Sequence, residues 1–150
     1  MVSAATVGGI TWYEYAEPMV ATFEGKRNHA YKDVVGVPTI CYGSTEGVKM
    51  GDYKTDEECS LLLKYELEKR AKVIDRIVTV PITEPQKAAL VSFMYNVGEG
   101  AFRGSTLLKK LNRGDYSGAC SELKRWVYAG GKKWKGLISR REIEEMMCRG

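Results

Sequence analysis

The chain has 150 residues, 44% hydrophobic and 28% charged, which suits one globular domain, or one domain of two small lobes, with its own core. These proportions exclude a disordered chain, a collagen and a coiled coil, and no apolar run approaches the roughly 18–20 residues of a membrane-spanning helix. The net charge of +4 is uneven: residues 1–102 carry 11 basic and 14 acidic side chains, whereas residues 103–150 carry 12 and 5. A basic C-terminal third indicates either a polyanionic partner, such as a nucleic acid, a membrane surface or a cell-wall polymer, or a solvated helical surface.

The N-terminal region leads into the first predicted helix. Residues 1–10 are rich in Ala, Gly, Val and Ser, and they lack the basic and fully apolar stretches of a secretory signal. We expect a short helix over Glu17–Phe23, because Pro18 suits a first turn and Gly25 a C-terminal stop. Glu24 then lies at the C-terminal end of this helix, where the negative end of the helix dipole disfavours an ionised carboxylate.

The next segment favours strands. Residues 29–43 are rich in Val, Ile, Thr and Tyr, and glycines punctuate them. They predict a small antiparallel sheet with loops that reaches to about Tyr53, with Pro38 on an edge strand because proline cannot donate a ladder hydrogen bond.

The rest of the chain is predicted to be helical. A capping box at 55–58 opens a long helix to about Ile77, which we expect to connect two lobes. A second capping box at 83–86 precedes the helix Ala88–Val97, which is apolar almost all round and is therefore expected at the centre of the core, with Gly98 and Gly100 ending it. Shorter helices are expected over Ser105–Leu111, Asp115–Tyr128 and Leu137–Met147.

Four cysteines leave the redox state open. Cys41, Cys59, Cys120 and Cys148 allow three pairings into two disulfides, or none, and a chain of this size does not need them. None stands in CxxC spacing and the chain has one histidine, which argues against a zinc site.

The pattern with chemical content lies around the end of the first helix. Asp33 follows Glu24 by nine residues, and Thr39 follows Asp33 by six. Two carboxyl groups facing each other across a cleft suit glycoside hydrolysis, in which one protonates the leaving oxygen and the other stabilises charge or activates water. In a chain with 19 acidic residues this spacing alone singles out nothing, and Asp33 reads equally well as a turn residue and Thr39 as an ordinary strand residue.

These three residues fit without gaps the pattern Glu-x8-Asp-x5-Thr, and the segment resembles the catalytic motif of the phage lysozymes of glycoside hydrolase family 24. The resemblance covers about residues 17–148. Within the family, the sequence is most similar to endolysins of lambdoid phages, several of which carry an N-terminal signal-anchor-release segment. Further likeness lies in Phe93–Gly98, Ser105–Leu108, Arg125–Trp126, Ala129–Gly131 and Gly136–Glu142.

The resemblance implies an α+β fold of two lobes, with a small N-terminal β-sheet lobe and a helical C-terminal lobe joined by a long helix. The cleft would bind peptidoglycan, and the reaction would hydrolyse the β-1,4 bond between N-acetylmuramic acid and N-acetylglucosamine. Glu24 would be the general acid, Asp33 the second carboxylate and Thr39 a residue that holds the attacking water. Inversion, associated with the family, implies carboxyl groups roughly 6.5–9.5 Å apart. No metal or organic cofactor is implied.

Candidate substrate-binding residues follow from the same resemblance. For the uncharged ones, packing in the core is the alternative. Arg140 and its neighbour Arg141 are expected to contact either the helix that carries Glu24 or the glycan, and the alternative is solvated helix charge. The candidates are Tyr42, Gly43, Tyr95, Asn96, Thr106 and Arg140.

Several residues depart from the family pattern or stay outside the site. Family members often have histidine at the position of Ser44, so either Ser44 orders the cleft differently or the sheet is looser. Pro38 stands where related endolysins have a larger residue. We expect His29 to be a surface or strand residue without a catalytic part. Trp126 and Trp134 are expected to be anchors of the core and of the lobe edge.

The resemblance gives residues 1–16 a meaning of their own. They are interpreted as the remnant of a signal-anchor-release region that associates transiently with the inner membrane, and residues 17–150 as the lysozyme domain. The alternative is export from the host cytoplasm through a holin. The released enzyme is expected to act as a monomer in the host periplasm, where disulfides persist, and Cys120 and Cys148 lie on helices of one lobe that could approach each other.

Three other functions compete. A lytic transglycosylase needs one Glu and no second carboxylate, so Asp33 separates it from a hydrolase. A non-catalytic wall-binding module would not need Glu24. A cationic membrane-active protein would rely on the basic C-terminal third and weaken with salt. We expect no nucleic-acid partner, because no binding motif accompanies the basic residues.

Overall fold

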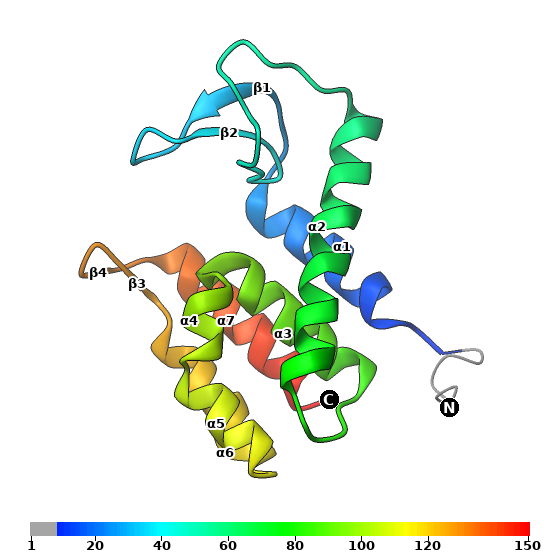
Figure 1. The fold of residues 1–150 in the computed structure, drawn as a ribbon. Coiled ribbons are helices and arrows are strands. Elements are labelled where there is room, and N and C mark those ends of the chain that lie inside the picture. Colours follow the sequence, from blue (N-terminus) through cyan, green and yellow to red (C-terminus); the bar gives the residue numbers. More distant parts are fainter. Residues whose placement is uncertain (1–8) are drawn as a thin grey trace.

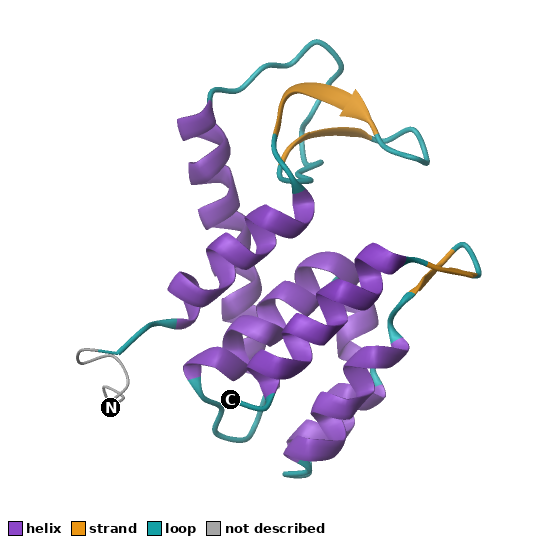
Figure 2. Cartoon of the chain, turned by 180° about the vertical axis from the view of Figure 1, so that it is seen from behind, coloured by secondary structure: helices purple, strands orange, loops and turns teal. Residues whose placement is uncertain are grey.

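The computed structural model describes residues 9–150, which form two lobes along the long helix α2 (Asp56–Ile77) (Figure 1). The N-terminal lobe holds the strands β1 (Arg27–Lys32) and β2 (Pro38–Cys41), and the other lobe is almost entirely helical (Figure 2). This is the α+β, two-lobe arrangement that the sequence implied. The remaining helices are α1 (Trp12–Glu24), α3 (Glu84–Val97), α4 (Glu99–Arg103), α5 (Thr106–Asn112), α6 (Tyr116–Glu122) and α7 (Lys135–Cys148).

Helix α1 starts earlier than predicted. It begins at Trp12 rather than Glu17, because Thr11 caps it and Glu14 completes a capping box. The backbone N–H of Trp12 also donates to Oε1 of Glu84, at the start of α3, at 2.7 Å. Pro18 therefore lies inside the helix, and its assignment to a first turn was wrong. The other end is confirmed: α1 ends at Glu24, before a glycine with φ +72°.

The small sheet agrees with the prediction. Strands β1 and β2 pair antiparallel, with Tyr31 opposite Thr39 and Lys32 opposite Pro38. An isolated bridge between His29 and Tyr53 extends the sheet to the expected limit. Pro38 opens β2, a position where its missing N–H costs no interior ladder bond.

The two long helices confirm their capping boxes. Helix α2 is capped by Thr55 and α3 by Thr83, and both capping boxes are complete. Every residue from Ala88 to Met94 is buried, so α3 forms the centre of the core. It ends before Gly98, which has φ +93°. Gly100, predicted as part of the stop, instead lies in a further short helix, α4.

The predicted helix Asp115–Tyr128 is shorter than expected. Helix α6 ends at Glu122, and a turn of 3₁₀ helix, η2, covers Leu123–Arg125. The chain then forms a hairpin of β3 (Tyr128–Ala129) and β4 (Lys132–Lys133). Gly130 and Gly131 have φ values of +61° and +75°, which a two-residue hairpin turn requires. This pair of glycines therefore forms a β-turn rather than part of a link between two helices.

Two disulfides select one pairing from the three that the sequence allowed. Cys41–Cys59 joins β2 to α2, with Cα atoms 5.0 Å apart. Cys120–Cys148 joins α6 to α7 within one lobe, with Cα atoms 5.7 Å apart, as expected for that pair. One crosslink thus ties the sheet to the connecting helix, and the other ties the C-terminal helix to its neighbour.

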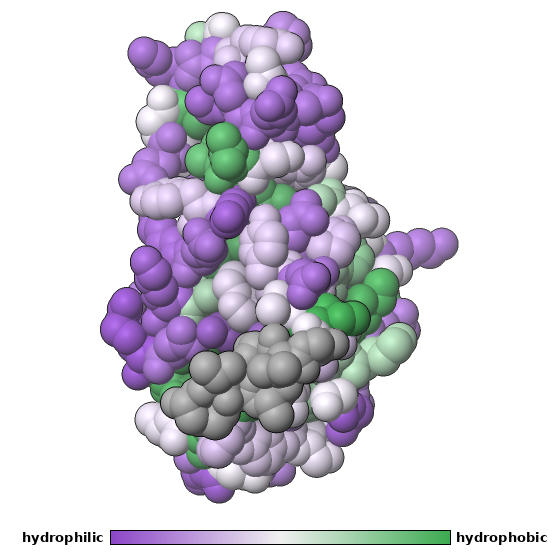
Figure 3. All heavy atoms as spheres, turned by 90° about the vertical axis from the view of Figure 1, so that its right-hand side faces the viewer, coloured by the Kyte–Doolittle hydropathy of each residue, from purple (hydrophilic) through white to green (hydrophobic). Residues whose placement is uncertain are grey.

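The surface beside α2 is mostly hydrophilic, and its hydrophobic side chains form separate small groups (Figure 3). Over residues 9–150, no helix has both the length and the apolarity needed to cross a membrane. Half of the interpreted anchor remnant, residues 1–8, lies outside the described residues.

Candidate active site

Glu24 is the last residue of α1, where the chain turns towards the sheet. Its side chain is 21% exposed, so it is accessible but largely surrounded by protein. Gly43, directly after β2 and Tyr42, lies against it: a Cβ atom on Gly43 would stand 3.1 Å from Oε1 of Glu24. The sheet lobe therefore packs closely on the carboxyl group at the helix end.

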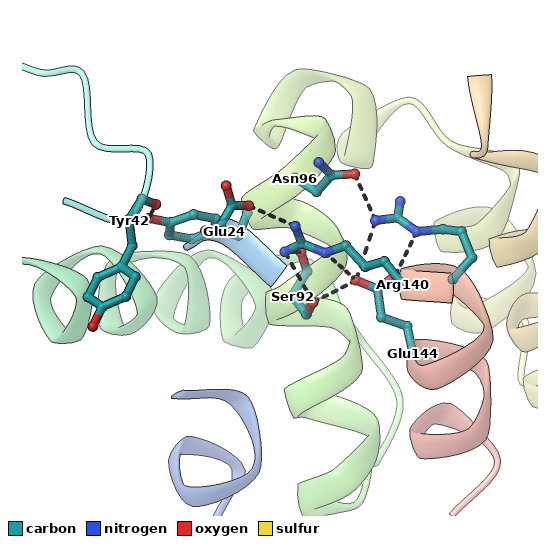
Figure 4. A network of polar contacts seen from close by, with 8 residues as sticks. Glu24, Tyr42, Ser92, Asn96, Arg140 and Glu144 are labelled. Atoms are coloured by element: carbon teal, nitrogen blue, oxygen red, sulfur yellow. Dashed lines mark hydrogen bonds and ion pairs between the residues drawn. The ribbon is translucent and has the colours of Figure 1, made fainter. Parts of the chain in front are cut away.

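Arg140 reaches Glu24 from the other lobe (Figure 4). Its Nη1 donates to Oε2 of Glu24 at 2.7 Å, across 116 positions of sequence. Arg140 lies on α7 and is 4% exposed, and its guanidinium also stacks on the Phe23 ring at 5.1 Å. This confirms that Arg140 contacts the end of the helix that carries Glu24.

The remaining donors of Arg140 are held by protein groups. Its Nη2 donates to the backbone oxygen of Ser92 at 3.0 Å and to Ser92 Oγ at 3.3 Å. Its Nε donates to Oε2 of Glu144 at 3.3 Å. A planar guanidinium with contacts on three sides has little freedom to rotate, so it fixes the position of the Glu24 carboxyl group.

Arg141 lies beside this group and is 1% exposed. Its Nη2 donates to Oδ1 of Asn96 at 2.7 Å, and its Nε lies 2.9 Å from Oε1 of Glu144. Burial lowers the pKa of Arg141 to about 10, against the opposing effect of the Glu144 charge. Arg141 is therefore part of the interior rather than a solvated helix charge.

Asp33 and Thr39 are held by the turn between β1 and β2. Oδ1 of Asp33 accepts hydrogen bonds from the backbone N–H groups of Val35 at 3.0 Å and Val37 at 2.8 Å. The Thr39 side chain is buried, and its hydroxyl donates to the backbone oxygen of Val37 at 2.8 Å. Both side chains thus form hydrogen bonds with the backbone of Val37. Asp33 also bonds to the backbone of its own turn, as expected of a turn residue.

Tyr95 links α3 to the loop after β2. Its hydroxyl donates to the backbone oxygen of Tyr42 at 2.6 Å, and the Arg70 guanidinium lies 4.6 Å from its ring centre. Burial, followed by the charge of Glu24, raises the Tyr95 pKa. A polar pocket of about 220 Å³ opens next to it. The lining residues are Gly43, Ser44, Thr45, Glu46, Glu66, Lys69, Arg70 and Tyr95.

Ser44 occupies the position at which the family often has histidine. It is buried, and its backbone exchanges hydrogen bonds with Ile40 in both directions at 2.9 Å. The loop that carries Gly43 is therefore closed onto β2 by its backbone rather than by the Ser44 side chain.

Other candidates lie apart from Glu24 or play structural parts. Thr106 is exposed at the start of α5. His29 is exposed on β1 and stacks on Tyr53 at 4.9 Å between ring centres, as expected for a strand residue. Trp126 packs on Phe93 at 5.3 Å, and Trp134 is half exposed beside the hairpin, where its Nε1 donates to a backbone oxygen. Both tryptophans are anchors, as predicted.

Two residues of the site escaped prediction. Ser92 is the one hydroxyl in the middle of the apolar helix α3, and Glu144 follows Arg140 by one helical turn on α7. A polar residue inside an apolar helix, and an acid spaced i+4 from an arginine, are both visible signals in the sequence. The sequence does not show that α3 and α7 pack against each other, and this packing brings Ser92 and Glu144 into contact.

The arrangement suits proton transfer. The partly exposed carboxyl group of Glu24 lies against the buried guanidinium of Arg140, and the carboxylate of Asp33 lies on a turn of the sheet lobe. In the part of the chain that the structure describes, no group of three or more His, Cys, Asp or Glu residues is arranged to hold a metal ion.

Comparison with known proteins gives matches over nearly the whole chain. The model of the phage lysozyme family matches residues 21–144. A SAR-endolysin of Bacteriophage PS119 is 52% identical over 126 residues, covering 83% of this chain and 75% of that protein. A SAR-endolysin of Escherichia phage Mu is 45% identical over 139 residues, covering 91% and 81%.

Solved structures match as well. The muramidase domain of SpmX from Asticaccaulis excentricus superposes with a TM-score of 0.83 at 29% identity, covering 91% of this chain and 95% of that one. The endolysin from the Escherichia coli O157:H7 phage FAHEc1 has a TM-score of 0.80 at 32% identity, covering 93% and 94%.

Proposed function

This chain belongs to the phage lysozyme family, and we propose that Glu24, Asp33 and Thr39 carry out its muramidase reaction. The protein is an endolysin, a glycoside hydrolase that degrades bacterial peptidoglycan for lysis of the host cell. The bond cleaved is the β-1,4 bond between N-acetylmuramic acid and N-acetylglucosamine.

Glu24 acts as the general acid in this proposal. The observation that carries it is the contact between its carboxyl group and the buried Arg140 at 2.7 Å. Hydrolysis needs an acid whose oxygen is fixed beside the glycosidic oxygen, because a displacement of about 1 Å can cost a factor of about 100 in rate. Arg140 supplies that fixation from a side chain that is itself immobilised. Its donors are committed to protein, so we assign it to positioning rather than to substrate binding.

Asp33 and Thr39 handle the attacking water. Backbone N–H groups of Val35 and Val37 orient the Asp33 carboxylate, and the Thr39 hydroxyl uses its proton on the Val37 oxygen. The Thr39 oxygen is thereby left as an acceptor for a water proton. In an inverting reaction Asp33 removes the other proton while Glu24 protonates the leaving oxygen, which requires carboxyl groups roughly 6.5–9.5 Å apart.

The glycan binds, in this proposal, along the cleft beside Tyr42, Gly43, Tyr95 and Asn96, with Thr106 further along the helical lobe. The polar pocket next to Tyr95 supports this assignment, because its charged and hydroxyl side chains can satisfy sugar hydroxyl and N-acetyl groups. Gly43 contributes by the absence of a side chain, which keeps the space in front of Glu24 open.

We further propose that residues 1–16 belong to a signal-anchor-release region and that residues 17–150 are the lysozyme domain. The named SAR-endolysins among the relatives support association with the inner membrane through the N-terminus and release into the periplasm. The enzyme then passes from the host cytoplasm to the inner membrane and acts, as a monomer, in the periplasm.

The test is digestion of purified peptidoglycan by wild type, Glu24→Gln and Asp33→Asn, with the products separated and weighed by mass spectrometry. We expect wild type to release fragments with reducing ends, and both variants to lose at least about 100-fold in rate, since each removes one of two coupled proton transfers. Full activity of Asp33→Asn with anhydro products would instead establish a transglycosylase.

A further inference from the structure

Glu144 is the most deeply buried charged residue near the site, with 0% of its surface exposed. It lies on α7, and its Oε2 accepts a hydrogen bond from Ser92 Oγ on α3 at 2.6 Å (Figure 4). It does not touch Glu24. The proposed mechanism assigns no role to Glu144, although burying a carboxylate is costly unless it is paired.

The charged residues around Glu144 indicate its role. Arg140 and Arg141 are both buried, 4% and 1% exposed, and Glu144 contacts both of them. Its Oε2 accepts from Arg140 Nε at 3.3 Å, and its Oε1 lies 2.9 Å from Arg141 Nε. One buried acid therefore faces two buried cations, and Glu24, 2.7 Å from Arg140, is the other carboxyl group beside them.

We propose that Glu144 is a positioning residue that acts through Arg140: it holds the two arginines in place behind Glu24 and sets how much uncompensated positive charge the general acid faces. The proposal rests on the assignment of Glu24 as general acid. Glu144 itself reaches neither substrate nor the reacting atoms, so its effect is transmitted entirely through the guanidinium of Arg140.

Tyr95, Ser92 and Arg141, which face this cluster, keep their charge state in the working range. From α3, Tyr95 has its pKa raised by burial and by Glu24, so it stays neutral, and Ser92 is uncharged. From α7, Arg141 has a pKa of about 10 and stays charged. The arginines oppose the effect of burial on Glu144, whose pKa burial raises. From α1, Glu24 is the group whose proton the reaction uses.

The proposal has two consequences of opposite sign. Glu144→Gln removes a negative charge, so excess positive charge stabilises the ionised form of Glu24. The alkaline limb of the pH–rate profile, at which the general acid loses its proton, then moves to lower pH. Arg141→Gln removes a positive charge and must move the same limb to higher pH. A merely structural role of either residue would change the rate without moving the limbs in opposite directions.

The experiment measures kcat/KM for purified peptidoglycan from about pH 4 to pH 9 with wild type, Glu144→Gln, Arg141→Gln and a matched control. We expect shifts of about one pH unit in the two directions, and therefore a roughly tenfold lower rate for Glu144→Gln above the wild-type limb. The control is Glu122→Gln, which removes another buried, ion-paired carboxylate of the same lobe, 2.8 Å from Lys110. Its limb should coincide with that of wild type.

Folding is checked by far-UV circular dichroism before each profile. If Glu144→Gln does not fold, the shift measured for Arg141→Gln alone tests the proposal. The double variant Arg141→Gln/Glu144→Gln restores the charge balance, so its alkaline limb should lie near that of wild type. Unshifted limbs in folded single variants overturn the proposal. If Glu24→Gln is fully active, the proposed function fails instead, whatever the position of the limbs.

Discussion

Gly43 couples the conformation of the sheet lobe to the carboxyl group of Glu24, the proposed general acid. Its φ of +90° is a conformation that residues with a Cβ rarely adopt, and the missing side chain leaves room for Oε1 of Glu24. Gly36, in the turn between the strands, has φ +86° but nothing within 4 Å of where a Cβ would stand. A comparison of Gly43 with Gly36 therefore distinguishes the effect of backbone strain from the effect of contact with Glu24.

Alanine at these two glycines should have unequal effects. Gly43→Ala and Gly36→Ala should each cost about 1–2 kcal/mol of stability, since both force a Cβ into positive φ. Only Gly43→Ala also displaces Glu24, so we expect it to lose a further factor of roughly 10 or more in kcat. Urea unfolding and peptidoglycan hydrolysis measure the two effects. Equal activity of the two variants would contradict the close approach.

Arg140 offers a test of geometry at constant charge. Arg140→Lys keeps a cation, but an ammonium group cannot bond Glu24, Ser92 and Glu144 together as a planar fork does. We expect kcat to fall roughly 10- to 100-fold with a smaller change in KM. Arg149→Lys, at the exposed end of α7, is the control and should behave as wild type. Full activity of Arg140→Lys would mean that charge alone suffices.

At the residue scale, much of the site was open to prediction. The glycine after α1 placed Glu24 at a helix end, and the resemblance to the family motif, rather than the spacing alone, singled out Asp33 and Thr39. Arg140 was expected at Glu24 or at the glycan. The charge balance among Ser92, Glu144 and the two arginines was not predictable, because it depends on how α3 and α7 face each other, across about 50 positions of sequence.

At the element scale, local signals were reliable where they were used. The capping boxes at 55–58 and 83–86 predicted the starts of α2 and α3, because capping depends on residues three apart. The same motif at 11–14 marks the start of α1, and reading Pro18 as a first-turn residue concealed it. The hairpin β3–β4 is too short to leave an alternating pattern, so the predicted helix Asp115–Tyr128 extended as far as its first residue.

The disulfides stabilise different elements, which predicts separable effects of removing them. Cys120–Cys148 closes 28 residues of sequence and Cys41–Cys59 closes 18, so each Cys→Ala pair should cost about 2–4 kcal/mol of stability. Only the loss of Cys41–Cys59 loosens β2, which carries Thr39, and should also lower the lytic rate. Thermal unfolding and lysis of the two double variants measure this. Equal lytic rates would show that the sheet does not need its crosslink.

At the scale of the whole molecule, the charge asymmetry matches peptidoglycan as the substrate. Residues 103–150 carry 12 basic and 5 acidic side chains, whereas the stem peptides of peptidoglycan carry carboxylates. The basic third belongs to the helical lobe, from which Arg140 reaches the sheet lobe. The two lobes therefore hold different parts of the proposed site: the sheet lobe carries Asp33 and Thr39, and the helical lobe holds Glu24 in place and carries the basic third.

Salt should act on association rather than on chemistry. Raising the ionic strength from about 0.01 M to 0.15 M shortens the screening length from about 30 Å to 8 Å and weakens attraction between the basic third and the wall. The buried pair of Glu24 and Arg140 is screened much less. We expect KM for peptidoglycan to rise several-fold while kcat changes little, measured on the same peptidoglycan at fixed pH. A fall in kcat with constant KM would contradict this division.

The central claim is that Glu24 is the acid that cleaves the glycan. It is tested most directly by the loss of turbidity of outer-membrane-permeabilised Gram-negative cells, with wild type, Glu24→Gln and Glu17→Gln at equal concentration. Glu17 lies on the same helix two turns earlier and serves as the matched control. The account predicts that wild type and Glu17→Gln clear the suspension and that Glu24→Gln does not. Equal clearing by all three would contradict it and point to lysis by the cationic surface instead.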